Sequence, residues 1–458
     1  MSVTAVTAEV QSEVITAEII EKITDEIIAQ YKEDDSRPWI VGFSGGKDST
    51  TLLQLVFYAL IHLSKKEELK REVHVLCNDT LVENPAVVRY IDDTLDKIRM
   101  AGESYGFPIT VVKVTPVLAD SFWINLIGKG YPSPNRFFRW CTERMKINPT
   151  NEYIKKIAGK YGEAIILLGT RKAESANRAY SMSQYERKGK RLRKHSLHGV
   201  YVFAPIANLL DAHVWAYLLQ VPSPWNGDNR KLFTLYRNAS GGECPLVIDD
   251  TTPSCGNSRF GCWTCTVVEH DKSMEGLIDS GETWMEPMLD FRDWLRDVRN
   301  NEAMRMPYSR DLQDRLGPFT RNARAEILRR LLEVQKETGQ NLISEEELSG
   351  IQWIWHHDFH DAPVVANIYR DVYNLEAPAM RNEVVERKKR ERELLEKLCE
   401  EAGIDPNLVE QLIQIEKDKS GLMRRHGLFQ DIDMALKRYL KTQEMEDDEN
   451  ASDEDSST

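Results

Sequence analysis

Residues Ile40-Val-Gly-Phe-Ser-Gly-Gly-Lys-Asp-Ser49 decide the fold of this chain. An apolar run that starts at Trp39 stops at the glycine pair, and an apolar-periodic segment, 50–63, follows at once. The sequence therefore predicts a strand, a tight turn and a helix. Adjacent glycines let backbone N–H groups approach an anion, and both the helix N-terminus and Lys47 add positive charge. The turn is predicted to bind the phosphates of a nucleotide.

The spacing of this loop separates two kinds of phosphate site. A Walker-type loop requires G-x-x-x-x-G-K-[ST]. Here Gly42 to Gly46 is one residue too short, and Asp48 stands where the Mg²⁺-binding hydroxyl belongs. The run S-G-G-K-D-S after a first strand instead resembles the signature of the ATP pyrophosphatase (PP-loop) superfamily. That resemblance implies cleavage of ATP between its α- and β-phosphates, with an acceptor oxygen being adenylated.

Strands and helices alternate along the first half of the chain. The expected strands are 39–43, 72–77, 107–114, 164–169 and 201–205, and the expected helices are 9–32, 50–63, 84–105, 121–127, 151–160 and 212–220. Strands separated by helices predict an α/β fold with a doubly wound, mostly parallel sheet. The resemblance to the PP-loop superfamily implies an adenine nucleotide alpha hydrolase-like sheet.

The expected organisation follows from these elements and from shifts in composition. The regions are an N-terminal helical segment at 1–36, a PP-loop ATP pyrophosphatase domain at 37–235, a Cys-rich segment at 236–275, a mainly helical C-terminal region at 276–440 and a disordered acidic tail at 441–458. The tail has almost no apolar residues, which is the basis for expecting disorder.

Length and charge set outer limits on function. The chain has 458 residues and a formal net charge of −13. That charge argues against wholesale coating of nucleic acid but is compatible with a local basic patch. No apolar stretch approaches the roughly 20 residues that cross a bilayer, and residues 1–11 lack the features of a signal peptide. We expect a cytoplasmic protein with no membrane partner.

Ligands of doubly wound sheets bind beyond the carboxyl ends of the strands. The residues predicted there to hold ATP and Mg²⁺ are Ser44, Gly45, Gly46, Lys47, Asp48, Ser49, Asn78, Asp79, Gly169, Arg171 and Arg178. Two alternatives stay open, because the arginines could form surface ion pairs and Asn84-Pro85 could simply cap a helix.

Four of the seven cysteines fall within 22 residues of loop-like sequence. They are Cys244, Cys255, Cys262 and Cys265, the last two forming a C-x-x-C pair. Thiols clustered in a reducing compartment indicate a metal site or catalysis rather than disulfides. One C-x-x-C with two irregularly spaced partners suits an iron–sulfur cluster at least as well as zinc, and separate roles stay open.

Cys141 stands apart from that cluster, within Arg139-Trp-Cys-Thr-Glu-Arg-Met-Lys146. Three neighbouring cations predict a lowered pKa and a nucleophilic thiolate. Alternatively, Cys141 is a cluster ligand brought in from a distant loop, or it packs beside Trp140 while the cations bind nucleotide.

A basic segment, 185–195, interrupts the acidic chain. Lys188, Lys190, Arg191 and Arg193 could meet a nucleic-acid backbone, although a solvated flexible loop of the same composition is an equal alternative.

Taken together, the chain resembles the DndC family, the ATP pyrophosphatase sulfurtransferases of bacterial DNA phosphorothioation, and the related SspD proteins of single-strand phosphorothioation. The blocks that carry the resemblance are S-G-G-K-D-S, C-N-D-T-L-V-E-N-P, R-W-C-T-E-R-M-K, L-L-G-T-R-K-A-E-S-A-N-R and C-G-N-S-R-F-G-C-W-T-C-T-V-V-E-H-D, between about Trp39 and Met274.

The resemblance implies a [4Fe–4S] cluster on Cys244, Cys255, Cys262 and Cys265, which would leave Cys141 to relay sulfur or to border the nucleotide. Lys47, Asp48, Cys141 and Arg171 would be catalytic. The implied reaction adenylates a DNA backbone phosphate and replaces a non-bridging oxygen by sulfur. A cysteine desulfurase, other phosphorothioation subunits and DNA would be the partners.

Three other functions compete with this one. A sulfonucleotide (phosphoadenylylsulfate) reductase shares the fold, but it needs a cysteine near its C-terminus, and no cysteine follows Cys399 here. Its cluster-bearing members also use an adjacent Cys-Cys pair, which this chain lacks. A tRNA-thiolating PP-loop enzyme and an ATP-binding scaffold subunit are the others.

Overall fold

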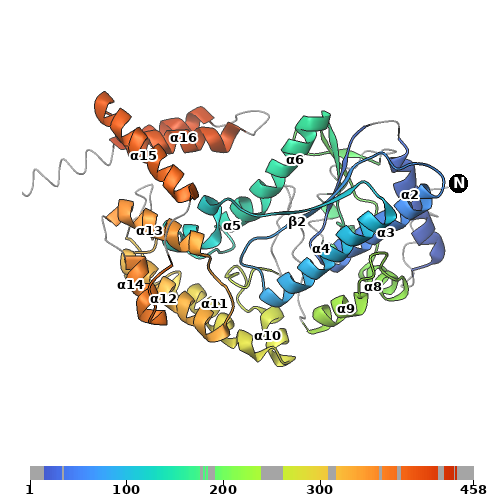
Figure 1. Ribbon diagram of the computed structural model, residues 1–458, viewed down its shortest axis with the longest axis horizontal. Coiled ribbons are helices and arrows are strands. Elements are labelled where there is room, and N and C mark those ends of the chain that lie inside the picture. Colours follow the sequence, from blue (N-terminus) through green and yellow to red (C-terminus); the bar gives the residue numbers. More distant parts are fainter. Residues whose placement is uncertain are drawn as a thin grey trace, which may run out of the picture. The chain divides into compact units, whose positions relative to one another are not determined.

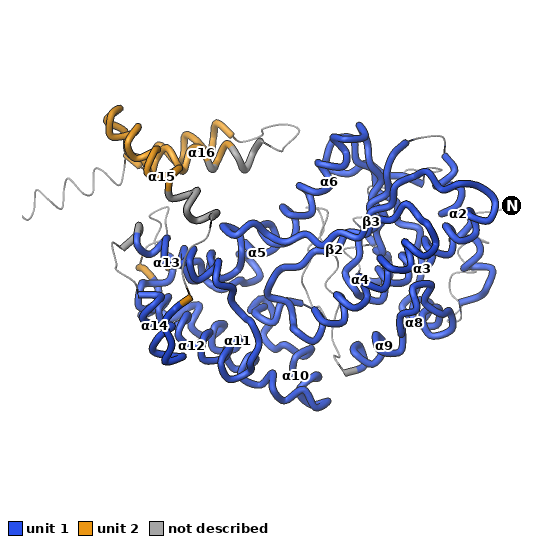
Figure 2. Tube along the Cα trace, viewed as in Figure 1, with its two compact units in different colours: residues 1–305, 318–377 blue, residues 306–317, 378–458 orange. Residues whose placement is uncertain are grey.

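The computed structural model describes residues 15–33, 36–175, 179–180, 182–183, 191–238, 261–307, 316–359, 364–378, 383–420, 428–437 and 439–440. The chain forms two compact units (Figure 2). Unit 1 comprises Met1–Arg305 and Pro318–Ala377, and unit 2 comprises Met306–Gly317 and Pro378–Thr458. The domain boundaries expected at 236 and 276 stay predictions.

A six-stranded sheet forms the centre of unit 1, in the order β3-β2-β1-β4-β6-β5 (Figure 1). The strands are β1 (Trp39–Gly42), β2 (Val73–Asn78), β3 (Ile109–Val114), β4 (Ala164–Leu167), β5 (Arg193–Lys194) and β6 (Val200–Phe203). All neighbours pair in parallel except β5, which lies antiparallel to β6 at one edge. The predicted α/β fold with a mostly parallel sheet is confirmed.

Helices cover both faces of this sheet. They are α2 (Ala17–Tyr31), α3 (Lys47–Ser64), α4 (Pro85–Tyr105), α5 (Trp140–Thr142), α6 (Asn148–Tyr161), α8 (Asp211–Gln220) and α9 (Asn229–Asn238). One apolar core joins α2, α3, α4 and α8 to the face that carries Val41 and Val75. A second, smaller core joins α6 to the opposite face, which carries Ile40 and Ile166. Alternate side chains of one strand thus enter different cores, as the pleat requires.

The order of the strands fixes where a ligand can bind. The chain moves outward from β1 through β2 to β3, and then returns to the other side of β1 with β4. The carboxyl ends of β1 and β4 therefore flank the switch point of the sheet, where doubly wound folds leave a crevice. The loop that begins at Ser44 follows β1 into this crevice.

A layer of helices completes unit 1. It contains α10 (Lys272–Asp279), α11 (Glu286–Val298), α12 (Arg321–Thr338), α13 (Glu345–Phe359) and α14 (Val364–Tyr373). Its helices pack on a π-helical turn, Ile124–Gly128, which overlaps the helix expected at 121–127. Trp123 Nε1 donates to the carbonyl of Leu342 at 2.7 Å, and Trp355 Nε1 donates to that of Ile127 at 3.1 Å.

Unit 2 is built around the helices α15 (Glu383–Ala402) and α16 (Pro406–Ser420). Arg392 joins them, since its guanidinium pairs with Glu410 and donates to Asn407 Oδ1 at 2.7 Å. Leu394 and Leu398, four residues apart on α15, are both more than half exposed. Residues at this spacing lie on the same face of a helix, so α15 presents an apolar stripe.

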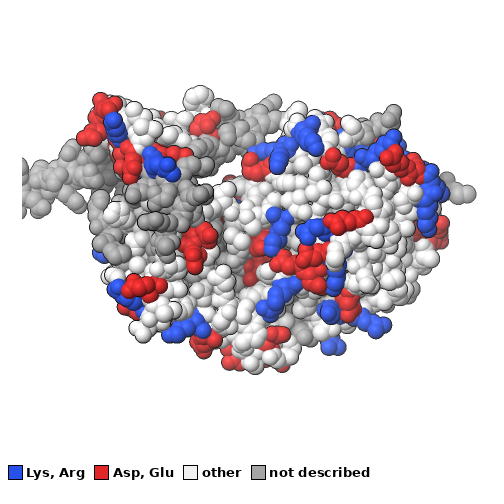
Figure 3. Space-filling view, viewed as in Figure 1, with Lys and Arg blue, Asp and Glu red and all other residues white. Residues whose placement is uncertain are grey.

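The surface charge of unit 1 is mixed where it can be seen. The face shown in Figure 3 intersperses Lys and Arg with Asp and Glu around α4. Lys97–Asp93 and Lys113–Asp92 are two of the ion pairs in this area, at 2.6 and 2.8 Å. Among the described helices, none is both long and apolar enough to cross a bilayer.

Candidate functional site

The loop after β1 has the shape that its glycines allow. Gly45 has φ +72°, and a Cβ atom at this position would lie 2.6 Å from Ile91 Cγ1. Gly46 caps α3, which begins at Lys47, three residues earlier than its apolar periodicity indicates. Ser49 Oγ accepts from Ser44 N–H at 3.2 Å. Hydroxyl oxygens thus accept loop N–H groups of the kind that bind an anion.

Lys47 points into the protein. Its side chain is 4% exposed, and Nζ lies 3.1 Å from Asp211 Oδ1. The ammonium group also faces the ring of Tyr236, 5.2 Å from its centroid, and the Tyr236 hydroxyl accepts the Lys47 N–H at 3.1 Å. Residues of α8 and α9 therefore hold both the charge and the backbone of Lys47.

Arg171 joins the two strands that flank the switch point. It follows β4, it is 2% exposed, and its Nε donates to Asp48. Its terminal nitrogen also donates to Asp211 Oδ1 at 3.0 Å. Burial acts to lower the pKa of Arg171, but Asp48, Glu174 and Asp211 outweigh it and raise that pKa. A Cβ atom on Gly169 would lie 2.8 Å from the Asp48 carbonyl, so this glycine permits the close approach.

Of the residues predicted to bind nucleotide, Lys47, Asp48 and Arg171 therefore lie together at the switch point. Asp211, Tyr236 and Trp215 belong to the same cluster but were not predicted from the sequence. Asp211 carried a signal, because it directly precedes the helix expected at 212–220. The aromatic residues carried none, because their contact with Lys47 depends on the packing of α8 and α9 against α3.

Polar residues after β2 turn away from that cluster. Asn78 Nδ2 donates to the Lys146 carbonyl at 3.3 Å, and Asp79 pairs with Lys113 at 3.1 Å. Asn84 accepts from Ala86 N–H at 3.0 Å and caps α4. Arg178 lies outside the described residues.

The C-x-x-C segment is hydrogen-bonded to the residues that follow the carboxyl end of β2. Thr80 Oγ1 lies 3.3 Å from Cys262 Sγ, and Trp263 N–H donates to the Val82 carbonyl at 2.9 Å. Cys265 N–H donates to the Cys262 carbonyl at 3.0 Å, which closes the turn between the two thiols. Since β2 pairs with β1 in parallel, the cysteines and the phosphate loop both lie at the carboxyl ends of the strands.

Cys141 shares a cavity with the C-x-x-C pair. The cavity measures ≈ 50 Å³, and its walls include Cys141, Cys262, Cys265 and Lys146. Cys244 and Cys255 lie outside the described residues. The position of Cys141 in this cavity is compatible with the alternative in which it is a ligand from a distant loop. Its position in the sequence alone did not indicate this.

The thiol of Cys141 is not activated in this arrangement. Burial raises the pKa of Cys141 to about 12, and the neighbouring Cys262 and Cys265 act in the same direction, whereas Lys146 opposes them. Burial likewise raises the pKa of Cys262 to about 12. The prediction that nearby cations lower the Cys141 pKa is wrong here, because burial outweighs the effect of Lys146, and Arg144 pairs with Asp120 at 2.5 Å instead.

The donor set can be tested against the group that it would hold. Among the described residues, no group of three His, Cys, Asp or Glu side chains is placed to hold a metal ion. Three soft sulfur ligands, Cys141, Cys262 and Cys265, line one cavity, and thiolates of this kind bind both zinc and iron–sulfur clusters.

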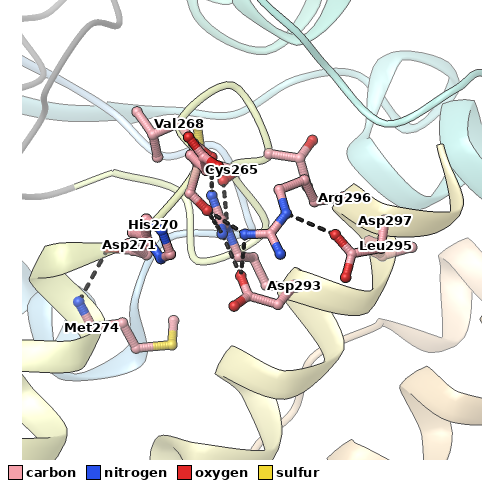
Figure 4. Close-up of polar contacts among 12 residues, drawn as sticks. Cys265, Val268, His270, Asp271, Met274, Asp293, Leu295, Arg296 and Asp297 are labelled. Carbon is pink, nitrogen blue, oxygen red and sulfur yellow. Dashed lines mark hydrogen bonds and ion pairs between the residues drawn. The ribbon is translucent and has the colours of Figure 1, made fainter. Parts of the chain in front are cut away.

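Arg292 of α11 holds the loop that continues from the cysteines. Figure 4 shows Cys265 and Val268 of this loop near Asp293 of α11. The Arg292 side chain is fully buried, and Nε donates to the Cys265 carbonyl at 2.8 Å. The same guanidinium donates to the carbonyls of Glu269, at 2.8 Å, and Val268, and it pairs with Asp293. Arg292 thereby binds three carbonyls of the stretch 265–269, a role that no sequence pattern indicated.

An aromatic cluster closes the other side of the segment. Trp263, between the two cysteines, is 2% exposed. The centroids of Trp123 and Phe291 each lie 5.9 Å from that of Trp263. Trp123 comes from the segment after β3 and Phe291 from α11, so the turn is wedged between the sheet domain and the helical layer.

The predicted nucleic-acid residues lie elsewhere. Arg191 Nε donates to Gln30 Oε1 at 3.2 Å, and the guanidinium also pairs with Glu33. Arg193 lies in β5. Lys188 and Lys190 lie outside the described residues.

The sheet, the loop and the cysteine segment fall within one family region. The phosphoadenosine phosphosulfate reductase domain matches residues 38–268, about half of the chain. This chain belongs to the phosphoadenosine phosphosulfate reductase domain family. Members of the family are enzymes that bind nucleotides. A second match, to a small protein found in certain Dnd DNA modification systems, covers residues 390–437 in unit 2.

Curated relatives of this reductase-family chain include two uncharacterized proteins of Methanocaldococcus jannaschii. MJ0066 is 28% identical over 239 residues, which make up 52% of this chain and 38% of MJ0066. MJ0973 is 26% identical over 204 residues, which make up 44% of this chain and 41% of MJ0973. The matched region thus spans about two fifths of either relative.

Solved structures of similar proteins include phosphoadenylyl-sulfate (PAPS) reductase from Candida auris in its phosphate complex. It is 16% identical, with a TM-score of 0.28 over 46% of this chain and 90% of that chain. U34-tRNA thiolase NcsA from Methanococcus maripaludis with its [4Fe-4S] cluster is 14% identical, with a TM-score of 0.28 over 62% and 80%. At these TM-scores neither structure bears on the cofactor or reaction of this chain.

Proposed function

We propose that this chain is an ATP-dependent sulfurtransferase of DNA phosphorothioation. It would cleave ATP to AMP and pyrophosphate, adenylate a backbone phosphate of DNA and exchange a non-bridging oxygen for sulfur. The observation that carries the proposal is the shared sheet edge, where the phosphate loop after β1 and the cysteines tied to β2 are neighbours. The match of residues 390–437 to a protein of Dnd DNA modification systems supports DNA as the acceptor.

The phosphate loop supplies the activation step. The N–H groups of 44–47 and the start of α3 would bind the leaving pyrophosphate, as helix N-termini bind anions. Lys47 and Arg171 add charge, and Asp48 holds Arg171 in place. Asp48 would also hold the Mg²⁺ that accompanies ATP, because carboxylate oxygens are its preferred protein ligands. The phosphate oxygen attacks the α-phosphorus, and pyrophosphate departs.

Cys141, Cys262 and Cys265 would hold a [4Fe–4S] cluster; Cys244 and Cys255, which the resemblance also implies as ligands, lie outside the described residues. The convergence of Cys141, Cys262 and Cys265 on one cavity supports this assignment. When bound, the cluster supplies iron sites that can bind sulfur. Arg292 keeps the Cys265 loop in position, and the buried Trp263 excludes water from the turn.

The sulfur step is balanced if a persulfide is the donor. Its terminal sulfur attacks the adenylated DNA phosphorus, and AMP leaves with the former phosphate oxygen. A second thiol then cleaves the sulfur–sulfur bond, is oxidised to a disulfide and releases the phosphorothioate. A cysteine desulfurase is the chemical class of partner that makes such a persulfide.

Unit 2 supports assembly with other subunits of a modification complex. It contains the match to the small Dnd-system protein, and α15 displays the exposed stripe of Leu394 and Leu398. Exposed leucines at helical spacing are typical of helix-to-helix contacts between proteins.

The test of the proposed function is the product of ATP cleavage. Anaerobic, cluster-loaded full-length protein should release AMP and pyrophosphate from ATP, faster when DNA is present. With a cysteine desulfurase and cysteine added, digestion of the DNA should yield phosphorothioate-linked dinucleotides by mass spectrometry. Release of ADP and inorganic phosphate instead would remove the proposal.

A reductase acting on phosphoadenylylsulfate is the second candidate, because the family that the chain belongs to carries that name. The same preparation, given phosphoadenylylsulfate and a dithiol reductant, would then release sulfite. Sulfite formation together with an absence of pyrophosphate release would replace the sulfurtransferase by this reductase.

A further inference from the structure

A second hollow lies beside the cysteine cavity in unit 1. It measures ≈ 650 Å³ and is walled by 135–137, by 266–269 and by four residues at and just after the end of α11. Val267 and Val268 line both hollows, so one stretch of loop separates them. None of the residues assigned to ATP lies in its walls. We call this hollow the arginine cleft.

The walls of the arginine cleft carry excess positive charge. Its cations are Arg136, Arg296 and Arg299, and its acids are Glu269 and Asp297. Arg296 pairs with Asp297 at 2.9 Å. Arg136 is exposed, and no described carboxylate lies within ion-pair distance of Arg136 or Arg299. The cleft therefore presents guanidinium groups to an incoming anion.

Backbone carbonyl groups orient the side chain of Arg299. One terminal nitrogen donates to the carbonyls of Pro134, at 2.7 Å, and Thr266, at 2.9 Å. These acceptors are neutral, so they fix the direction of the guanidinium but carry no opposite charge. Burial lowers the pKa of Arg299, and the neighbouring Arg292 and Arg296 lower it further, whereas Asp297 acts in the opposite direction.

A fully exposed aromatic ring stands at the same cleft. Phe137 is 100% exposed. It is displayed by a tight turn, in which Asn135 Oδ1 accepts the N–H groups of Phe137 and Phe138 at 2.8 and 2.9 Å. Phe138, by contrast, is 43% exposed and has its ring centroid 6.3 Å from that of Tyr131. Water contact over a whole phenyl ring is unfavourable, so a ring that the turn holds out in this way suits a partner that covers it.

Phosphates and unpaired bases are the chemistry that this combination recognises. Arginine forks bind phosphate oxygens, and aromatic side chains stack on the faces of bases. A base inside a duplex is already stacked on its neighbours, so Phe137 favours an unpaired one. A protein with acidic residues could use both the arginines and the ring, because arginine and aromatic residues are enriched in protein interfaces. The DNA acceptor of the proposed function is what favours a nucleic acid here.

We propose that the arginine cleft binds an unpaired segment of DNA, with Arg136 and Arg299 on its phosphates and Phe137 stacked on a base. The inference rests on the proposed function, because it names the surface that presents the acceptor phosphate. Since Val267 and Val268 separate the cleft from the cysteine cavity, a strand lying here would pass beside the proposed site of sulfur delivery.

Fluorescence anisotropy with a short, labelled single-stranded oligonucleotide and the cluster-loaded full chain tests this surface. Phe137→Ala should weaken binding about tenfold, and Phe137→Trp should retain it. Arg136→Gln should weaken binding and reduce the slope of log K against log salt by about 0.7. Phe138→Ala is the matched aromatic control. Arg99→Gln, which removes an exposed arginine paired with Asp96 on α4, is the charge control.

Three outcomes would contradict this proposal. Phe137→Ala and Arg136→Gln could bind the oligonucleotide as tightly as the wild type does, or the two control variants could lose as much affinity as the two cleft variants. The wild-type protein could also bind duplex DNA or a tRNA competitor more tightly than the single strand. A cleft failure is distinguishable from failure of the proposed function. If the variants bind DNA normally while the wild type still makes AMP, pyrophosphate and phosphorothioate, only the cleft is wrong.

Discussion

The buried guanidinium of Arg292 donates from Nε to the carbonyl oxygen of Cys265 at 2.8 Å. This bond links α11 to the C-x-x-C turn across 27 residues of sequence. Arg292 also donates hydrogen bonds to the carbonyls of Val268 and Glu269, so it contacts three residues of the loop that follows Cys262. The position of one proposed cluster ligand thus depends on a helix outside the region that the family match covers.

Replacing Arg292 by Lys should therefore destabilise both the fold and the cysteine site. A lysine cannot reach three carbonyls at once, and unsatisfied buried acceptors cost about 1–3 kcal/mol each. We expect a loss of about 3 kcal/mol in unfolding free energy by urea denaturation, and less iron bound per chain. Arg329→Lys, a partly exposed arginine of α12 that pairs with Asp371, is the control and should change the free energy of unfolding by less than about 1 kcal/mol. Equal effects of the two changes would contradict this role.

Gly45→Ala should disrupt the phosphate loop by two separate causes. The left-handed backbone costs about 1–2 kcal/mol for any residue with a Cβ, and at this position the Cβ would also meet Ile91 at 2.6 Å. Gly106→Ala isolates the first cause, because Gly106 has φ +65° and a Cβ atom there would have nothing within 4 Å. We expect the thermal unfolding temperature to fall in both variants, but loss of ATP binding in Gly45→Ala alone. Normal nucleotide binding by Gly45→Ala would show that the loop does not hold the phosphates.

Asp48 and Arg171 should behave as one coupled pair. Both side chains are buried, so removing one charge leaves the other charge buried without this partner, which costs about 3–5 kcal/mol of stability. We expect Asp48→Asn and Arg171→Met each to destabilise by about 3 kcal/mol, and the double variant to lose clearly less than the sum. A double-mutant cycle by urea denaturation measures the coupling. Pyrophosphate release should vanish in both single variants at temperatures where they are still folded.

Cys141→Ser should lower the iron and acid-labile sulfide that the purified protein carries, as should Cys262→Ser and Cys265→Ser. The reason is that all three thiols face one cavity. Cys399→Ser is the matched control, since Cys399 is a buried cysteine of α15. A Cys141→Ser variant with a full complement of iron but no sulfur transfer would return Cys141 to the role of sulfur relay.

His74 should make the fold sensitive to mild acid. Burial lowers the pKa of His74, and Glu72 offsets this only in part. A folded-state pKa below the unfolded value of about 6.5 means that the stabilising contribution is complete above that pH and is lost as pH falls through the folded pKa. We expect unfolding free energy to decline between about pH 7 and pH 5, and less steeply in His74→Gln. Parallel pH curves for the two proteins would exclude His74 as the cause.

The fold was largely predictable because its decisive signals are local. A buried strand followed by Gly45-Gly46 can only turn, and the apolar helix after it must pack back on the sheet. β5 escaped prediction because two residues, Arg193 and Lys194, carry no strand pattern of their own. They looked instead like part of a basic loop.

The candidate site was only half predictable, since its remaining parts meet through tertiary packing. The sequence indicated Lys47, Asp48 and Arg171, yet it did not connect Asp211 with them, although Asp211 contacts both cations. It also assigned Arg144 to Cys141 by adjacency along the chain. In the fold that arginine faces Asp120, while Cys141 lies buried among other thiols. Neighbours in space, not in sequence, set the pKa.

Trp263 gives the protein a property that its chemistry does not require. The indole stands between Cys262 and Cys265, is shielded from water, and lies 5.9 Å from the ring of Trp123. An excited indole loses its energy to a nearby visible-absorbing group before it can emit light. If the proposed cluster binds in the cysteine cavity, the fluorescence of this tryptophan pair should therefore weaken on binding and recover when the cluster is removed. Tryptophan fluorescence would then report how much cluster the chain carries.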